Sequence, residues 1–370
     1  MKTIGYVSFE NPFTDRKAWS GTIYKIREGL ENAGLKVKWV KIDPPKMKIF
    51  LLKLYLKLRY NAAFHHPILY KLMANYTDWE TADSCDILFF PGGAQIINHS
   101  PIKKPYIYYT DACFSQMVNY YWFNLRNSHI KLADEEEKRA IQNASLNIRS
   151  SDWARNCAVN YYGDNPAKNF VLEFGANIDD EDIVESQVFS GGQLRILFSG
   201  VDWQRKGGAI AVDVVRNLRE KYHIDARIMI VGIRALSDDY VSLPFVDNLR
   251  FLNKNNAEEY RRYTDVVMRS HLLLLPTRAE CSGIVFCEAA GYGLPVFTYD
   301  TGGIQNYVEN GKNGYRLPLG STGEDFADQI FRSIQNGEFP NMHKSALALY
   351  NDKLSWNAWS LRFRKIFETL

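Results

Sequence analysis

Two glutamates, Glu280 and Glu288, are the residues whose type and spacing first suggest chemistry. Glu280 follows the apolar run 271–276 in a turn-like stretch, and Glu288 lies inside an apolar segment where an unpartnered charge is costly. We expect that segment to be a helix that Gly283 opens, so the first backbone N–H groups, those of Gly283, Ile284 and Val285, would form an anion site. Eight helical residues rise by roughly 12 Å. The two carboxylates could therefore hold hydroxyl groups at both ends of one long ligand, and a nucleotide sugar has that layout.

The residues alone leave a second interpretation open, in which Glu280 is solvated and Glu288 forms a buried salt bridge. Arg205 and Lys206 favour the first interpretation, because they follow the apolar run 194–200 and stand beside two glycines, as a diphosphate site requires. Gly302 and Gly303 follow the run 295–300 and could also bring backbone N–H groups to an anion or a sugar. Most Gly pairs are simply turns, so this last signal is weak.

Short apolar runs alternate with amphipathic stretches along the whole chain, which predicts two parallel α/β sheets in tandem. The first helix is predicted from Ile23 to Ala33, with Gly34 ending it and Ser20 near its start. The strand-like runs of the first series are 3–9, 36–42, 86–91, 105–110, 145–150 and 169–174. Those of the second series are 194–200, 226–232, 249–252, 271–276 and 295–300. Ligands of such open sheets bind at the carboxyl ends of the strands.

Composition limits the class of protein. The chain has 370 residues with 46% hydrophobic residues, enough for two domains with real cores. Its five cysteines are scattered and form no CxxC pair, so we expect neither a disulfide framework nor a structural zinc site. We expect a cytoplasmic protein, because neither a signal segment nor a spanning helix is recognisable in the sequence.

Several motifs in one order resemble a known family: the retaining glycosyltransferases of the GT-B type, most of all glycosyltransferase family four. The motifs are E-x7-E from Glu280 to Glu288, RKG at 205–207, GYGLPV at 291–296, DTGGIQNYVENGKNGYRLP at 300–318, DWARNCAVNYYG at 152–163, FGANID at 174–179 and WSGT at 19–22. The resemblance is strong after residue 195 and weak between 44 and 104.

The resemblance implies roles for these residues. Arg205 and Lys206 would neutralise the diphosphate leaving group, Glu280 would contact the donor sugar, and Glu288 would hold the ribose hydroxyls. The N–H groups of Gly283, Ile284 and Val285 would bind the distal phosphate, with Gly302 and Gly303 also at the donor, and Gly21 would let the N-terminal domain close over the diphosphate. No metal and no cofactor would be needed besides the nucleotide-diphosphate sugar itself, since cations and helix dipoles do the electrostatic work. Asp-Glu-Asp at 180–182 fits a metal-binding pattern, but we interpret it as a solvated turn.

The chain departs from the family at two places. Val201 follows Gly200 where many members have an arginine, and no histidine stands near the end of the strand 105–110. We place Asp111 at that second position, where it would act as a base or hold an acceptor hydroxyl.

The resemblance also implies the architecture. Residues 1–177 would form an acceptor-binding Rossmann-like domain and residues 178–350 a donor-binding one, facing each other across a cleft. Residues 351–370 would form a helix that crosses back to the N-terminal domain, burying the stripe of Trp356, Trp359, Phe363 and Phe367.

The acceptor would be a glycan or a lipid-linked molecule in cell-surface polysaccharide or glycoconjugate synthesis, and no nucleic acid is expected. Residues 46–60 mix five Lys or Arg with ten apolar residues and contain no acid. Such a basic amphipathic helix fits an anionic membrane surface, here the inner face, or else packs its apolar face in the core. The alternatives to a transferase are a non-catalytic sugar-binding subunit and a sugar-nucleotide epimerase or phosphorylase of the same fold. A dehydrogenase is disfavoured, because no G-x-G-x-x-G follows any strand.

Overall fold

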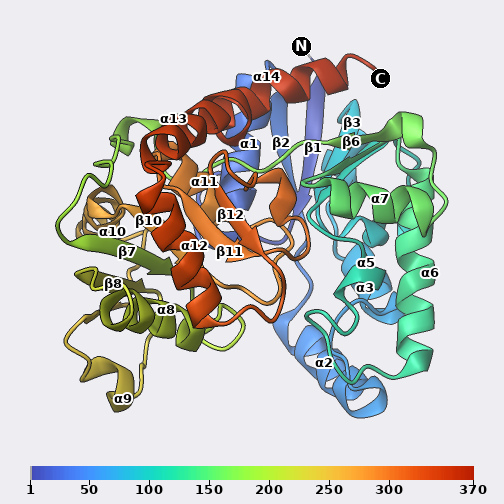
Figure 1. The fold of residues 1–370 in the computed structure, drawn as a ribbon. Helices are drawn as coiled ribbons and strands as arrows, with labels where there is room; N and C mark the ends of the chain where they lie inside the picture. The colour runs from blue at the N-terminus through green and yellow to red at the C-terminus, as the bar shows by residue number, and fades with distance from the viewer. Residues whose placement is uncertain (1) are drawn as a thin grey trace. The chain divides into compact units, whose positions relative to one another are not determined.

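A computed structural model describes residues 2–370 of the chain. The chain folds into two compact units (Figure 1). The first consists of Met1–Glu173 together with Trp359–Leu370, and the second of Phe174–Ala358.

The first unit is built on a six-stranded sheet in the order β2-β1-β3-β4-β5-β6, with every neighbouring pair parallel. The strands are β1 (Thr3–Ser8), β2 (Lys36–Lys41), β3 (Ile87–Pro91), β4 (Tyr106–Thr110), β5 (Leu146–Arg149) and β6 (Asn169–Val171). The helices are α1 (Thr22–Asn32), α2 (Lys46–Tyr60), α3 (Pro67–Ala74), α4 (Trp79–Asp83), α5 (Phe114–Met117), α6 (Asn127–Asn143) and α7 (Asp152–Asn160). Strands β3, β4 and β5 are buried along their whole length, as expected for a parallel sheet covered on both faces.

The second unit carries another all-parallel sheet, in the order β12-β11-β10-β7-β8-β9. Its strands are β7 (Leu194–Ser199), β8 (Ala226–Val231), β9 (Val246–Arg250), β10 (Leu272–Leu275), β11 (Val296–Tyr299) and β12 (Gly314–Leu317). Its helices are α8 (Gly208–Glu220), α9 (Asp238–Val241), α10 (Ala257–Arg269), α11 (Ile284–Gly291), α12 (Gly323–Gln335) and α13 (Phe339–Leu349). The predicted pair of doubly wound α/β units is confirmed.

In each sheet the chain adds its first strands on one side and then continues on the other, and open α/β sheets bind ligands at the point where this strand order reverses. In the first unit the reversal lies between β1 and β3, and in the second between β7 and β10. The loops that follow these four strands are therefore the first places to look for a site.

Three local predictions need correction. Ser20 does not cap α1, because Gly21 occupies the N-cap and no side chain caps the helix. Strand β9 lies at Val246–Arg250 rather than at 249–252, and β12 was not predicted. Both strands lie at the edges of their sheet, and the side chains from Asp247 to Arg250 are not buried, so neither forms the continuous apolar run of a central strand.

Helix α14 (Trp356–Phe367) begins in the second unit, and from Trp359 onward its residues belong to the first. Trp359 is fully buried against Gly29 of α1, where an added Cβ would lie only 2.7 Å from the indole ring. Its ring stacks on Phe363 with 5.0 Å between centroids, and both residues are buried within the first unit. Of the other two residues of the predicted stripe, Trp356 is buried but belongs to the second unit, and Phe367 is half-buried.

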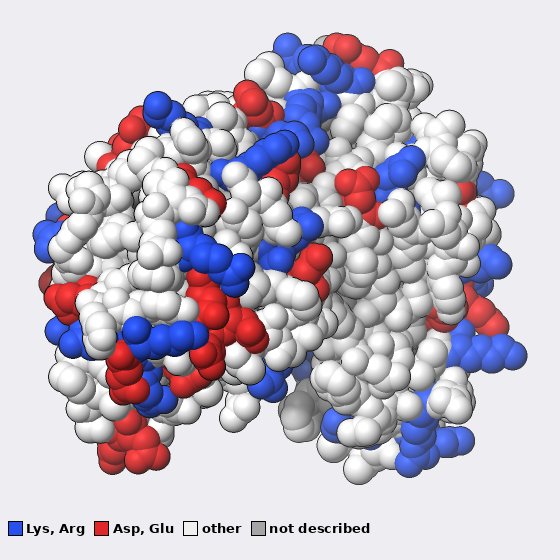
Figure 2. Space-filling model, viewed as in Figure 1, with Lys and Arg blue, Asp and Glu red and all other residues white. Residues whose placement is uncertain are grey.

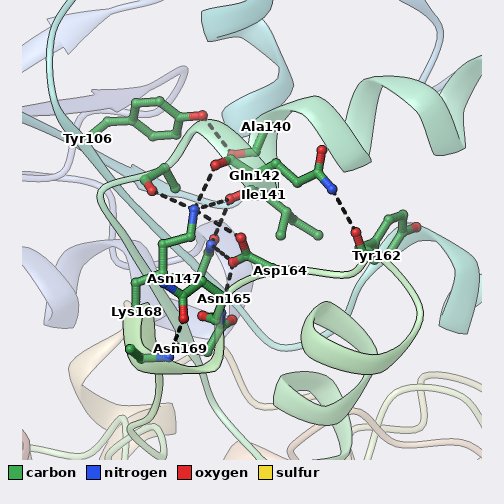
Figure 3. A network of polar contacts seen from close by, with 12 residues as sticks. Tyr106, Ala140, Ile141, Gln142, Asn147, Tyr162, Asp164, Asn165, Lys168 and Asn169 are labelled. Carbon is green, nitrogen blue, oxygen red and sulfur yellow. Dashed lines mark hydrogen bonds and ion pairs between the residues drawn. The ribbon is translucent and has the colours of Figure 1, made fainter.

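A polar network fixes the carboxyl end of α6 in the first unit (Figure 3). The ammonium of Lys168 donates to the carbonyl oxygens of Gln142 and Ala144, at 2.7 and 3.0 Å, and pairs with Asp164 at 2.9 Å. Asp164 also accepts from Asn147 of β5 and Asn169 of β6, at 2.6 and 2.8 Å. The network thus satisfies the last carbonyls of α6 and ties the helix to two strands.

Candidate functional site

The two predicted basic residues and Glu280 converge at the strand-order reversal of the second unit. Lys206 follows β7, Glu280 follows β10, and the Lys206 ammonium donates to Oε2 of Glu280. Arg205 Nη1 lies 3.5 Å from the same carboxylate oxygen and donates to the carbonyl of Ala279 at 2.8 Å. Lys206 and Glu280 are only 8% and 9% exposed, so Glu280 is not the solvated residue of the second interpretation.

The backbone fixes where these cations lie. Gly207 has φ +73°, and a Cβ there would lie 2.1 Å from the carbonyl oxygen of Pro276, so no other residue fits without movement. The N–H of Arg278 donates to the carbonyl of Arg205 at 2.8 Å, joining the loops after β7 and β10. The position of the two charges therefore depends on the fold rather than on flexible side chains alone.

Backbone N–H groups lie beside this cluster. Gly283 is the N-cap of α11, with φ +84°, so Ile284 and Val285 occupy the first two helical positions. The first N–H groups of a helix have no partner within it and carry the positive end of its dipole. The N–H of Gly303 donates to the carbonyl of Glu280 at 3.3 Å, which brings the Gly302–Gly303 loop against the same residue.

Glu288 of α11 is 3% exposed, and the structure places it in an ion pair. Its Oε1 accepts from the Lys254 ammonium at 2.5 Å, and its Oε2 accepts from the Tyr263 hydroxyl at 2.5 Å. Burial and the Glu288 charge raise the pKa of the Tyr263 hydroxyl. Contact with ribose hydroxyls stays a prediction, because a ligand there would share or replace these two partners.

The sequence did not single out Lys254 or Tyr263. Lys254 follows the edge strand β9, so a basic residue just past a strand was the available signal. A second cavity, of about 460 Å³, opens at the ends of β7, β8 and β9 and is lined among others by Val201, Trp203, Arg234 and Phe251.

In the first unit, the two predicted residues lie in the loops after β1 and β4. Gly21 caps α1 in the left-handed region, at φ 93°. Asp111 is half-buried and lines a cavity of about 220 Å³ at the reversal between β1 and β3. Glu137 and Gln95 line the same cavity, and sequence reasoning missed both because they belong to no motif.

The Asp180–Asp182 segment forms a short 3₁₀ turn. Asp180 accepts from the Tyr350 hydroxyl at 2.5 Å. Across residues 2–370 no group of three His, Cys, Asp or Glu side chains is placed to hold a metal ion. Independence from metals stays a prediction.

Comparison with known proteins decides the family of the segment that carries this cluster. Residues 193–336 match the family model described as glycosyl transferases group 1. This segment belongs to that family. It contains Arg205, Lys206, Glu280 and Glu288, so the resemblance seen in the motifs is confirmed.

Curated glycosyltransferases match more weakly along the chain. An uncharacterised glycosyltransferase of Methanocaldococcus jannaschii is 24% identical over 174 residues, 47% of this chain and 48% of its own length. D-inositol 3-phosphate glycosyltransferase of Gordonia bronchialis is 23% identical over 240 residues, 60% of this chain and 51% of its own length. The chain thus spans about half the length of these relatives in the matched parts.

Solved structures show the same fold over the whole chain. Sucrose-phosphate synthase of Thermosynechococcus elongatus has a TM-score of 0.70 at 15% identity, covering 100% of this chain and 99% of that one. The Anabaena protein HepE, in complex with UDP and glucose, has a TM-score of 0.64 at 16% identity, covering 100% of both chains. The predicted GT-B fold is therefore confirmed.

Proposed function

We propose that the protein is a retaining, metal-independent glycosyltransferase that moves a sugar from a nucleotide-diphosphate donor to a glycan or lipid-linked acceptor. The observation that carries this proposal is the contact of buried Lys206 and half-buried Arg205 with buried Glu280 at the strand-order reversal of the second unit. The likeness to a protein solved with UDP and glucose supports the choice of donor.

The proposed reaction uses these groups in separate roles. The bond between the anomeric carbon and the diphosphate oxygen breaks, and the acceptor oxygen bonds to the same carbon on the same face. The bonding electrons leave with the diphosphate, where Arg205, Lys206 and the first N–H groups of α11 stabilise the added charge. The proton of the acceptor hydroxyl passes to the departing diphosphate oxygen or to Asp111. Glu280 holds sugar hydroxyls while the ring gains positive charge.

The remaining part of the donor would extend toward β9. Glu288 and Lys254 would meet the ribose, and Phe251 stands three residues before Lys254 in the lining of the 460 Å³ cavity. An aromatic ring and a cavity of that size suit a nucleobase.

Purified protein incubated with UDP-, GDP- and dTDP-sugars tests the donor. A donor at about 100 times its Kd should stabilise the protein by about 2.7 kcal/mol. Transfer to an acceptor with unchanged anomeric configuration supports the proposal. Binding without turnover indicates the sugar-binding subunit, and a changed donor sugar without acceptor indicates the epimerase.

We further propose that α2 rests on the inner face of an anionic membrane. Leu56 is the one buried residue in α2, while Phe50, Leu54 and Leu58 are 61%, 47% and 73% exposed. Figure 2 shows Lys and Arg atoms beside uncharged atoms over this helix. Ile49 and Leu52 are half-buried beside Leu56, so one apolar stripe of α2 packs inward, while other apolar residues of the helix stay exposed.

An exposed apolar face on a basic helix fits a surface of acidic lipids. Within residues 2–370, no helix combines the length and apolarity that crossing a membrane requires. Sedimentation with vesicles of acidic or neutral lipid tests the contact, with Phe50→Ser plus Leu54→Ser as the variant. Equal sedimentation of variant and wild type would refute it.

A further inference from the structure

We propose that the cavity at the strand-order reversal of the first unit binds one uncharged sugar ring of the acceptor. That the bound sugar is part of the acceptor rests on the proposed function. The cavity itself does not, because every residue that lines it belongs to the first unit. The cavity lies among the loops that follow β1, β3 and β4, where an open parallel sheet binds its ligand.

Two half-buried tryptophans form part of the wall. Trp19 comes from the loop after β1, and Trp122 from the segment before α6. The Trp122 ring is held by Phe64, His65 and Phe114, with ring centroids 4.7, 4.6 and 5.5 Å away. A fixed aromatic face offers apolar surface to the C–H face of a sugar without losing side-chain freedom on binding.

The cavity is also lined by buried polar side chains, and one of their oxygen atoms has no hydrogen-bond partner among the described residues. Gln95 Nε2 donates to Glu137 and lies 3.3 Å from the Tyr108 hydroxyl, which is itself 3.2 Å from the Glu137 carboxylate. Gln95 is 1% exposed, yet its Oε1 has no hydrogen-bond partner among the described residues. Buried acceptors rarely stay unpaired, and a ligand hydroxyl would supply the missing donor.

The charge of the lining selects against anions. Asp111 and Glu137 contribute carboxyl groups, and the described lining residues include no Lys or Arg. Burial lowers the pKa of His65 to about 4, so its ring is neutral. Arg149 does not line the cavity, since it is fully buried against the Tyr108 ring and donates to the carbonyls of Tyr108 and Ile148. Burial raises the pKa of Glu137 to about 7, so the selection against anions depends on the Asp111 carboxyl group and on the absence of cations from the described lining residues. A phosphate or carboxylate would find no cation there, whereas hydroxyl groups would find acceptors.

Size limits the ligand to one ring. The cavity measures about 220 Å³, below the roughly 300–1,000 Å³ of pockets that enclose drug-sized molecules. The terminal sugar of a longer acceptor would enter, and the rest of the acceptor would remain outside.

Ligand-observed NMR with the full chain, without any donor, tests the assignment. The panel contains methyl glucoside, methyl galactoside and N-acetylglucosamine, together with glucose 6-phosphate and glucuronate as anionic probes. At least one neutral sugar should bind at millimolar concentration, at least about tenfold more tightly than the anionic probes. Tighter binding of octyl than of methyl glucoside indicates a lipid-linked source of the ring, and equal binding indicates a free glycan.

Two variants separate a binding role from a structural one. Gln95→Leu should weaken the binding of the neutral sugar by about tenfold or more, since it removes the unpaired oxygen that would accept a hydrogen bond from the sugar. Gln142→Leu is the matched control, because Gln142 bonds to the Tyr162 carbonyl and does not line the cavity. Asp111→Asn should raise glucose 6-phosphate binding relative to the neutral sugar by about tenfold, a change in preference that misfolding would not produce.

The assignment is overturned if no neutral sugar binds, if an anionic probe binds best, or if Gln95→Leu and Gln142→Leu behave alike. Failure of every nucleotide sugar to bind, with neutral sugars still bound, would refute the proposed transferase and leave the cavity as a sugar site.

Discussion

Replacing Glu280 by glutamine should slow sugar transfer without weakening the binding of the nucleotide. The change keeps the side chain's shape and removes the charge that now faces Lys206 and Arg205. A donor diphosphate that uses the same cations competes with this carboxylate, so a bare nucleotide diphosphate should bind the variant as well as wild type or up to about tenfold more tightly.

The expected loss in turnover follows from the contact that Glu280 would make with the sugar. A hydrogen bond to a charged group is worth roughly 1.5–3 kcal/mol, and each 1.36 kcal/mol changes a rate about tenfold. If the contact strengthens as the ring gains positive charge, kcat should fall about 10- to 100-fold while donor KM changes little.

Steady-state kinetics, calorimetry with nucleotide diphosphate, and melting temperature give the three readouts. Asp247→Asn is the matched control, because Asp247 pairs with Arg227 at 2.6 Å near the amino end of the edge strand β9, whereas Glu280 follows the carboxyl end of the central strand β10. A Glu280→Gln enzyme with kcat within twofold of wild type, or with clearly weaker nucleotide binding, would refute the reasoning.

Four other predictions concern the same molecule. Glu288→Gln should mainly raise donor KM. A lowered melting temperature with unchanged KM would show instead that Glu288 only stabilises the fold through its ion pair with Lys254. Lys206→Ala should cut turnover by roughly 10²-fold or more while affecting donor binding less, and near-normal turnover would remove Lys206 from the mechanism. Activity should survive saturating EDTA, whereas loss reversed by Mn²⁺ would indicate a metal site. Burial raises the pKa of Glu137 from 4.5 to about 7, so the native state keeps a proton that the unfolded chain releases. The free energy of unfolding should therefore fall by about 3 kcal/mol as the pH rises from 4.5 to about 7. Denaturant titrations of Glu137→Gln should lack that fall.

The sequence by itself determined the alternating α/β order, most of the central strands and the loops that carry chemistry. Runs such as 271–276 predict buried parallel strands because every residue of such a strand faces a covered side. The edge strand β12 was missed, and β9 was predicted at 249–252 instead of Val246–Arg250, since part of the surface of both strands faces solvent. The motif resemblance also named the family and the residues of the second unit that match it.

Only the tertiary structure decided which charges meet. Lys206 and Glu280 are 74 positions apart, and Lys254 and Glu288 are 34 apart, so their pairing depends on strand order and loop geometry that no local pattern encodes. The same holds for the cavity beside Asp111, whose lining comes from the loops after three strands and from α6. It also holds for α2, whose apolar residues could equally have packed inward, since composition states that a face is apolar but not what covers it.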